Sequence, residues 1–173
     1  MVNLILSALL VCFGAQAFAN PIGDVEGTVV GVVDGDTLDV STGTVAYRVR
    51  LAAIDAPERS QAFGQRAKQE LAAMVHGRRV SLRCSKQERR PEGQRSREIC
   101  TVFSGGMDIN LSLVSLGWAW HYKAYAREQS SADRNAYEAA EASARASARG
   151  LWGDRNVVAP WAYRRDLSKG VRE

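Results

Sequence analysis

The chain has 173 residues, of which 46% are hydrophobic and 24% charged, and its formal net charge at pH 7 is +4. These proportions exclude a disordered or low-complexity chain, so we expect one soluble globular domain with its own core. A basic balance is compatible with a polyanionic partner, although solvated lysines and arginines on an ordinary surface give the same total.

Residues 1–19 have the pattern of an export signal. The apolar run "LILSALLVCFGAQAFA" ends in Ala17-Phe18-Ala19, a small-x-small sequence of the type that signal peptidase cleaves. The run is short for a membrane anchor, which needs about 20 apolar residues. We therefore predict a signal peptide at 1–19, a single mature domain at 20–173, a secreted or periplasmic location, and no membrane attachment after cleavage.

Removal of the signal leaves two cysteines, Cys84 and Cys100, in a compartment where disulfides persist. An even pair in an exported protein is a disulfide candidate, and a bridge would tie together the two strands that flank the polar loop between them. The alternative is two free thiols in adjacent strands. A zinc site fits poorly, because these cysteines and the two histidines, His76 and His121, lack the short paired spacings of structural zinc.

Three strand-like segments open the mature domain, at residues 25–33, 36–42 and 44–53. The turns between them are predicted at Asp34-Gly35 and Thr42-Gly43, and Gly35 is expected to supply a positive φ. In the third segment the apolar residues alternate with Arg48 and Arg50. The two arginines therefore share the face opposite the apolar one.

The rest of the chain combines helical and strand-like segments. Helical spacing is found at residues 60–76, 109–117 and 130–150, and alternation typical of strands at 78–85 and 97–103. From about residue 151 we expect an irregular tail, with Trp152 and Trp161 as docking points. Five short strands with a helix after the third predict an α+β fold, a five-stranded OB-type Greek-key β-barrel with about three helices.

Three carboxylates stand near the ends of the first strands. Asp36 follows the first turn, and the segment "RVRLAAIDAPERS" places Asp55 and Glu58 after the third strand, which Pro57 prevents from continuing. Such a group of oxygen donors suits a hard cation such as Ca²⁺. Taken separately, however, Asp34-Gly35-Asp36 is explained as a hairpin turn, and Asp55 to Glu58 as an Asx-type turn before a helix.

Taken together, the motifs are more specific. "VVDGDT", "RVRLAAIDAPE", "FGQRAKQEL", "RSREICTVF", "INLSLVSLGWAW" and "GLW" follow in an order and at separations that resemble the staphylococcal nuclease (thermonuclease) family over roughly residues 25–153. The combination of Asp-Gly-Asp-Thr with Arg-x4-Asp-x-Pro-Glu is specific to that family. The resemblance implies an OB-fold nuclease that hydrolyses DNA and RNA with Ca²⁺ and little sequence preference, leaving 3′-phosphates.

The resemblance also implies a role for each residue of the motif. It makes Asp36 and Asp55 calcium ligands, with the backbone carbonyl of Ala56 as a third, and it makes Glu58 the general base. A carboxylate that accepts a proton from an in-line water makes that water a better nucleophile. Arg50 becomes one of two phosphate-binding arginines, whose forked guanidinium matches the charge on phosphate oxygens.

The second phosphate-binding arginine implied by the resemblance is Arg97. Before it the family commonly has a tyrosine and a glycine, whereas this chain has Arg95 and Ser96. Arg95 therefore remains a rival for the same contact. Tyr122 and Tyr125 are both candidates for the substrate-binding tyrosine, and aromatic packing is the alternative role for each of them.

The main alternative function is a non-catalytic nucleic-acid-binding module with the same fold, and another is recognition of an acidic polysaccharide. A purely electrostatic binder gains nothing from Asp36, Asp55 and Glu58, because these charges repel a phosphate unless a cation intervenes. This argument favours an enzyme, and the resemblance implies Ca²⁺ as its cofactor and DNA and RNA as its partners. Nothing in it suggests more than a monomer.

Overall fold

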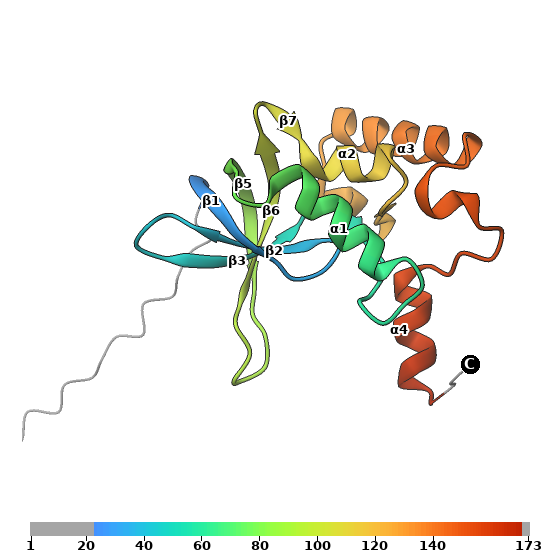
Figure 1. The fold of residues 1–173 in the computed structure, drawn as a ribbon, viewed down its shortest axis with the longest axis horizontal. Coiled ribbons are helices and arrows are strands. Elements are labelled where there is room, and N and C mark those ends of the chain that lie inside the picture. Colours follow the sequence, from blue (N-terminus) through green and yellow to red (C-terminus); the bar gives the residue numbers. More distant parts are fainter. Residues whose placement is uncertain (1–22, 171–173) are drawn as a thin grey trace, which may run out of the picture.

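Five strands close into a barrel in the computed structural model, which describes residues 23–170. They are β1 (Asp24–Val32), β2 (Thr37–Ser41), β3 (Ala46–Leu51), β5 (Arg79–Glu88) and β6 (Arg97–Ser104). The order is β3-β2-β1-β5-β6, and parallel pairing of β3 with β6 closes the barrel (Figure 1). The predicted α+β, OB-type fold is confirmed. The predicted signal peptide at 1–19 lies outside the described residues.

Short strands and helices surround this barrel. The short strands are β4 (Ile54–Asp55), β7 (Met107–Asp108) and β8 (Trp120–His121). The helices are α1 (Gly64–Val75), α2 (Ile109–Ser115), α3 (Ser131–Ala146) and α4 (Pro160–Ser168), with 3-10 turns η1 (Lys123–Glu128) and η2 (Gly150–Gly153). Within residues 23–170, no helix has the length and apolar character needed to cross a bilayer.

The core lies inside the barrel and beneath the helices that cover it. Alternation along each strand directs one face inward, and the inward residues Val40, Val49 and Val102 are fully buried. Leu71 of α1 and Leu113 of α2 complete this core. The apolar positions that the sequence patterns place on one face of each strand and helix are therefore the positions that form the core.

The turn between β1 and β2 includes Asp34 and Gly35, as predicted, but the reason for the glycine was wrong. Gly35 is not among the residues with positive φ. A Cβ at this position would lie 2.7 Å from the Cβ of Ala56 and 2.8 Å from the Cβ of Ala67. Glycine is needed because the turn packs directly against α1 and the loop after β4, and this contact brings Asp36 next to Ala56.

The C-terminal segment also differs from the prediction of an irregular tail, since it contains η2 and α4. A nine-residue helix is too short to be stable in isolation, so its own residues carry little signal. Docking stabilises it: the ring of Trp161 lies 6.2 Å from Trp120 and 5.5 Å from Tyr122. The predicted docking role of Trp161 is confirmed, and Trp152 likewise contacts Trp120, with ring centroids 5.1 Å apart.

The cysteine pair is bridged. Cys84 of β5 and Cys100 of β6 are direct cross-strand partners and form a disulfide, which confirms the predicted pairing. Cys100 is fully buried, and its carbonyl accepts hydrogen bonds from the backbone N–H of Ala52, just after β3, and from the side chain of Asn110 in α2. The bridge therefore supports the part of the barrel from which the loop after β3 leaves.

Removing the bridge is expected to lower the free energy of unfolding by about 3 kcal/mol. Without the bridge, the unfolded chain regains the conformational entropy that closing a loop of this size removes. The measurement is thermal unfolding of the protein with and without reductant, beside the double variant Cys84→Ser, Cys100→Ser. An unchanged melting temperature in both cases would contradict the stabilising role of the bridge.

Candidate active site

A cleft of about 1020 Å³ lies at one end of the barrel. Its walls come from the β1–β2 turn, the end of β3, the β5–β6 hairpin, η1 and α4. The β5–β6 hairpin and α4 extend in the same direction from the barrel (Figure 1). Elements far apart in sequence therefore build a single concave surface.

Strand pairing brings the predicted aspartates to this cleft. Thr37 pairs with Arg50 across β2 and β3, so Asp36 lies beside the end of β3. Asp55 pairs with Trp120 across β4 and β8, which holds it between Ile54 and Ala56, two residues that line the cleft. Both carboxylates are buried, with residual exposures of 5% for Asp36 and 1% for Asp55. The end of β3 is thus the point where both side chains meet.

Arg50 joins the two aspartates. Its Nη2 lies 2.8 Å from Oδ1 of Asp55 and 3.3 Å from Oδ2 of Asp36. The same Oδ2 of Asp36 accepts a hydrogen bond of 3.1 Å from the backbone N–H of Ala56. The negative charge of Asp36, followed by that of Asp55, raises the pKa of Arg50, so this guanidinium stays charged.

The acids are crowded and poorly hydrated. Burial, followed by the charge of Asp36, raises the pKa of Asp34 to about 6. Burial also raises the pKa of Asp55, although the hydrogen bond from Arg164 opposes this effect. Asp34, Asp36 and Asp55 are costly to ionise so close together, and a cation between such carboxylates stabilises their ionised forms.

Glu58 lies at the rim of the same group. Its backbone N–H donates to Oε1 of Gln61 at 3.1 Å, and its carbonyl accepts from the backbone N–H of Gln61 at 2.9 Å. These bonds form a turn at residues 58–61. The Asp55 carboxylate accepts from Arg50 and Arg164, so the Asx-type turn considered for this segment is not the role that it takes. The side chain of Glu58 retains 37% exposure, so water reaches its carboxylate, as a base that activates water requires.

Arg164 is a site residue that the sequence did not reveal. From α4 its Nη1 donates to Oε1 of Glu58 at 2.6 Å and to Oδ1 of Asp55 at 3.2 Å, and its Nη2 donates to Oδ2 of Asp55 at 2.7 Å. The contact with Glu58 spans 106 residues of sequence. A contact between residues so far apart leaves no local pattern in the sequence. Arg164 also lies in the segment that we predicted to be irregular.

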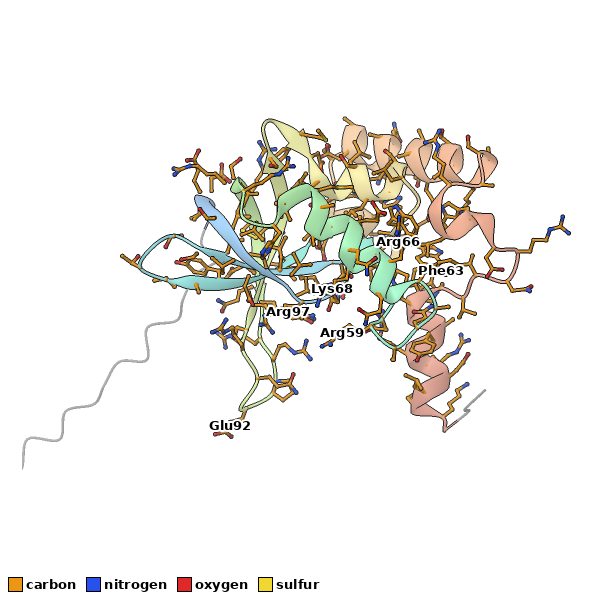
Figure 2. All side chains as sticks on the ribbon, viewed as in Figure 1. Arg59, Phe63, Arg66, Lys68, Glu92 and Arg97 are labelled. Carbon is orange, nitrogen blue, oxygen red and sulfur yellow. A yellow bond between two sulfur atoms is a disulfide. The ribbon has the colours of Figure 1, made fainter. Side chains whose placement is uncertain are left out.

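The structure separates the two rival arginines. Arg97 lines the cleft with a side chain that is 14% exposed, and its guanidinium lies 2.6 Å from Glu88. Arg95 is 57% exposed, does not line the cleft, and points to Asp39 of β2 at 3.6 Å. Figure 2 shows Arg97 at the base of the hairpin, with Glu92 at its tip. Arg97 is therefore the one of the two rival arginines that lines the cleft.

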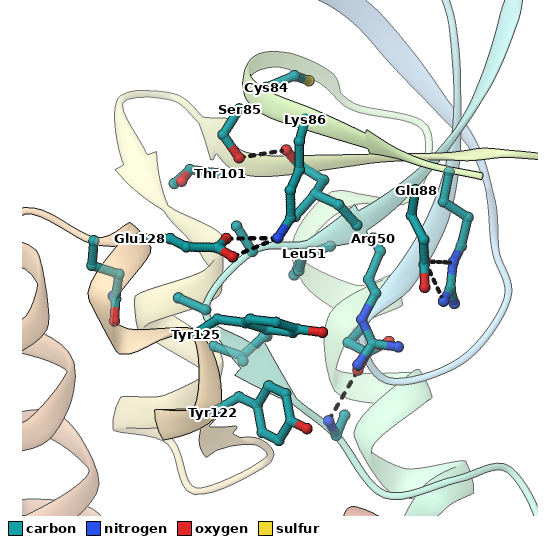
Figure 3. Close-up of a pocket in the computed structure, with 18 of the residues that line it drawn as sticks. Arg50, Leu51, Cys84, Ser85, Lys86, Glu88, Thr101, Tyr122, Tyr125 and Glu128 are labelled. Atoms are coloured by element: carbon teal, nitrogen blue, oxygen red, sulfur yellow. Dashed lines mark hydrogen bonds and ion pairs between the residues drawn. The ribbon is translucent and has the colours of Figure 1, made fainter. Parts of the chain in front are cut away.

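The two candidate tyrosines both line the cleft. Tyr122 and Tyr125 pack edge to face with centroids 5.2 Å apart, and Figure 3 shows them across from Arg50. The Nζ of Lys86 lies 4.4 Å above the ring of Tyr125. Their contact with each other, and the contact of Tyr122 with Trp161, also agree with the alternative role in packing. The cleft accommodates either tyrosine as a substrate contact.

The donor set fits an oxygen-preferring cation. Asp36, Asp55 and Glu58 present only carboxylate oxygens, and the guanidinium of Arg50 already lies between the two aspartates as a cation would. Within residues 23–170, no three acidic, histidine or cysteine side chains are grouped as a complete metal site. Further oxygen ligands would therefore have to come from backbone carbonyls, substrate or water, and the carbonyl of Ala56 stays a prediction.

An OB-type barrel with buried carboxylates and cleft-lining arginines belongs to the class of phosphate-binding, nucleic-acid-handling proteins. Comparison with known proteins narrows this class, because residues 48–154 match the family model described as "Staphylococcal nuclease homologue". The chain belongs to the staphylococcal nuclease family. The matched residues end before α4 begins.

Individual relatives agree with this family. The chain is 39% identical over 138 residues to an "Uncharacterized endonuclease" of Haemophilus influenzae, covering 79% of this chain and 71% of the relative. It is 38% identical over 151 residues to the "Micrococcal nuclease" of Shigella flexneri, covering 82% of each. It is 36% identical over 152 residues to "Protein ParB" of Escherichia coli, covering 83% of this chain and 81% of the relative.

Proposed function

We propose that this protein is a Ca²⁺-dependent nuclease that hydrolyses DNA and RNA with little sequence preference and leaves 3′-phosphates. The observation that carries the proposal is that Arg50 lies within 3.3 Å of carboxylate oxygens of both Asp36 and Asp55, and that Arg50, Asp36 and Glu58 line one cleft. Family membership and the relatives named as nucleases support the substrate class.

Glu58 and the two arginines have different roles in the proposed reaction. Glu58 accepts a proton from the water that attacks phosphorus, and the bond from phosphorus to the 5′-oxygen breaks, so the phosphate stays on the 3′ side. The departing 5′-oxygen takes up a proton from solvent water. Arg50 and Arg97 donate hydrogen bonds to the phosphate oxygens as negative charge builds on them. When bound to Asp36 and Asp55, Ca²⁺ polarises the phosphate and offsets the charge of these acids.

Digestion of single-stranded DNA, double-stranded DNA and RNA tests the proposal directly. Purified residues 20–173 should cleave all three substrates with Ca²⁺, leave 3′-phosphate ends, and stop when a calcium chelator is added. Retention of nucleic acid without cleavage under any divalent cation would instead make the protein a binding module of the same family.

The two arginines of the hairpin should differ in effect. Arg97→Lys is expected to impair turnover more than Arg95→Lys, because a lysine at position 97 keeps the charge but loses the bidentate geometry inside the cleft. Steady-state cleavage of one DNA substrate by both variants gives the order. A larger loss in Arg95→Lys would move the phosphate contact to Arg95.

We also propose that the protein is exported. The support is the apolar N-terminal run that ends in Ala17-Phe18-Ala19. The disulfide between Cys84 and Cys100 agrees with an oxidising compartment.

A further inference from the structure

Arg164 forms the densest set of polar contacts with the candidate metal ligands and base. Three hydrogen bonds of 2.6 to 3.2 Å connect its guanidinium to Asp55 and Glu58. The hydrogen bonds to Asp55, followed by those to Glu58, raise the pKa of Arg164, so it stays charged. A full positive charge from α4 therefore lies on the carboxylates that the proposed function assigns to calcium and to proton transfer.

The helix that carries Arg164 is an addition to the barrel. It lies beyond the residues matched by the family model. Besides the Arg164 contacts, it is attached through Trp161, through a 3.1 Å hydrogen bond between Tyr163 and Ser60, and through the 2.6 Å bond from Gln61 to the carbonyl of Val158 before it. In Figure 1, α4 packs beside the loop that precedes α1. These contacts hold α4 against the loop that carries Glu58.

Arg164 and a divalent metal ion would need the same carboxylate oxygens of Asp55. Oδ1 of Asp55 accepts hydrogen bonds from both Arg50 and Arg164, and its Oδ2 accepts from Arg164. A divalent ion bound to Asp55 would use the same oxygens, and it would face the positive charge of Arg164 within a few ångströms. At that distance like charges repel strongly, even with partial screening by water.

We propose that Arg164 is an intramolecular competitor of the calcium ion, so that metal binding requires this side chain to leave Asp55 and Glu58. The inference rests on the proposed function, which assigns calcium to this site. Arg50 differs in role because it projects from the barrel strand β3, whereas Arg164 belongs to a peripheral helix and its side chain is 40% exposed. Arg164 can therefore withdraw without opening the core.

The competition has two linked consequences. By thermodynamic reciprocity, if the contacts of Arg164 weaken calcium binding by some factor, calcium weakens those contacts by the same factor. Calcium should therefore loosen α4, and loss of the Arg164 guanidinium should tighten calcium binding. It also follows that calcium binding increases the fraction of molecules in which Glu58 is free of Arg164.

The first experiment is calorimetric titration of calcium chloride into the full mature protein without nucleic acid. Arg164→Gln should bind calcium about tenfold more tightly than the wild type, within the usual range of coupling between two linked sites. Arg165→Gln is the matched control, because it removes the same charge from the next position of α4, where the Arg165 side chain forms an ion pair with its neighbour Asp166. Its calcium affinity should equal that of the wild type.

The second experiment needs no variant and measures amide hydrogen exchange of residues 155–170. Calcium should speed exchange in this segment of the wild type, because α4 loses the three hydrogen bonds of Arg164. Slower exchange or no change with saturating calcium would overturn the competition, even if the Arg164→Gln variant folds poorly.

The outcomes separate this inference from the proposed function. Equal calcium affinity in the wild type and Arg164→Gln overturns the competition and leaves the calcium-dependent nuclease standing. Equal tightening in Arg164→Gln and Arg165→Gln overturns it as well, because a general charge effect then explains the gain. Calcium binding to neither the wild type nor Arg164→Gln removes the metal assignment and the inference together.

Discussion

Replacing Glu58 by glutamine is expected to slow phosphodiester cleavage by about 10²- to 10⁴-fold, the usual contribution of a general base. Glutamine has nearly the same shape, and its oxygen can still accept the hydrogen bond that Arg164 donates at 2.6 Å. It cannot, however, take a proton from water. The fold and the binding of nucleic acid should therefore survive while the chemical step is lost.

Single-turnover cleavage with saturating calcium measures this effect, and a binding titration with the same oligonucleotide shows whether affinity is kept. Glu70→Gln is a suitable control, because Glu70 lies on α1 outside the cleft and pairs with Arg66. It removes one carboxylate and should cleave at the wild-type rate. Wild-type cleavage by Glu58→Gln would show that another group activates the water.

Replacing Gly64 by alanine is expected to destabilise the protein by about 3 kcal/mol or more and to reduce cleavage as well. A Cβ on Gly64 would overlap the carbonyl oxygen of Glu58 and lie 2.8 Å from its carbonyl carbon. These atoms belong to the backbone, so no side chain can rotate away, and the loop that carries Glu58 must move. The start of α1 and the position of the base are therefore coupled.

Urea unfolding gives the change in stability, and cleavage below the unfolding transition gives the change in activity. Gly31→Ala is the matched control, because a Cβ there meets its nearest atom, Oδ2 of Asp39, at an ordinary 3.7 Å. Its stability should change by less than about 1 kcal/mol. The coupling of α1 to Glu58 is refuted if Gly64→Ala is as stable and as active as Gly31→Ala.

Most elements could be predicted because their signals are local. The alternation around Val49 in β3 and the helical spacing around Leu71 in α1 reflect burial on one face, which is visible within a few residues. Asp108 caps α2 by accepting a hydrogen bond from Leu111, and Ser130 caps α3, as their positions before helical patterns suggest. Helix α4 was missed because its stability comes from docking.

The candidate site was predictable only in part. Asp36, Arg50 and Asp55 belong to motifs near paired strand ends, so their meeting follows once the strands are paired. The motif "REICTVF" favoured Arg97 over Arg95, but which of the two side chains lines the cleft depends on how the β5–β6 hairpin packs. The turn at Gly35 was predicted from the sequence, but its packing against Ala67 became visible only in the tertiary structure.

The sequence by itself determined the barrel, the acidic motif and the pair of cysteines, because periodicity, turn chemistry and motif spacing are properties of neighbouring residues. Only the tertiary structure decided that Arg97 rather than Arg95 lines the cleft, and that Arg164 binds Asp55 and Glu58. These contacts depend on how α4 and the β5–β6 hairpin pack against the barrel. Such packing is settled by the summed contacts of distant segments, which no short stretch of sequence contains.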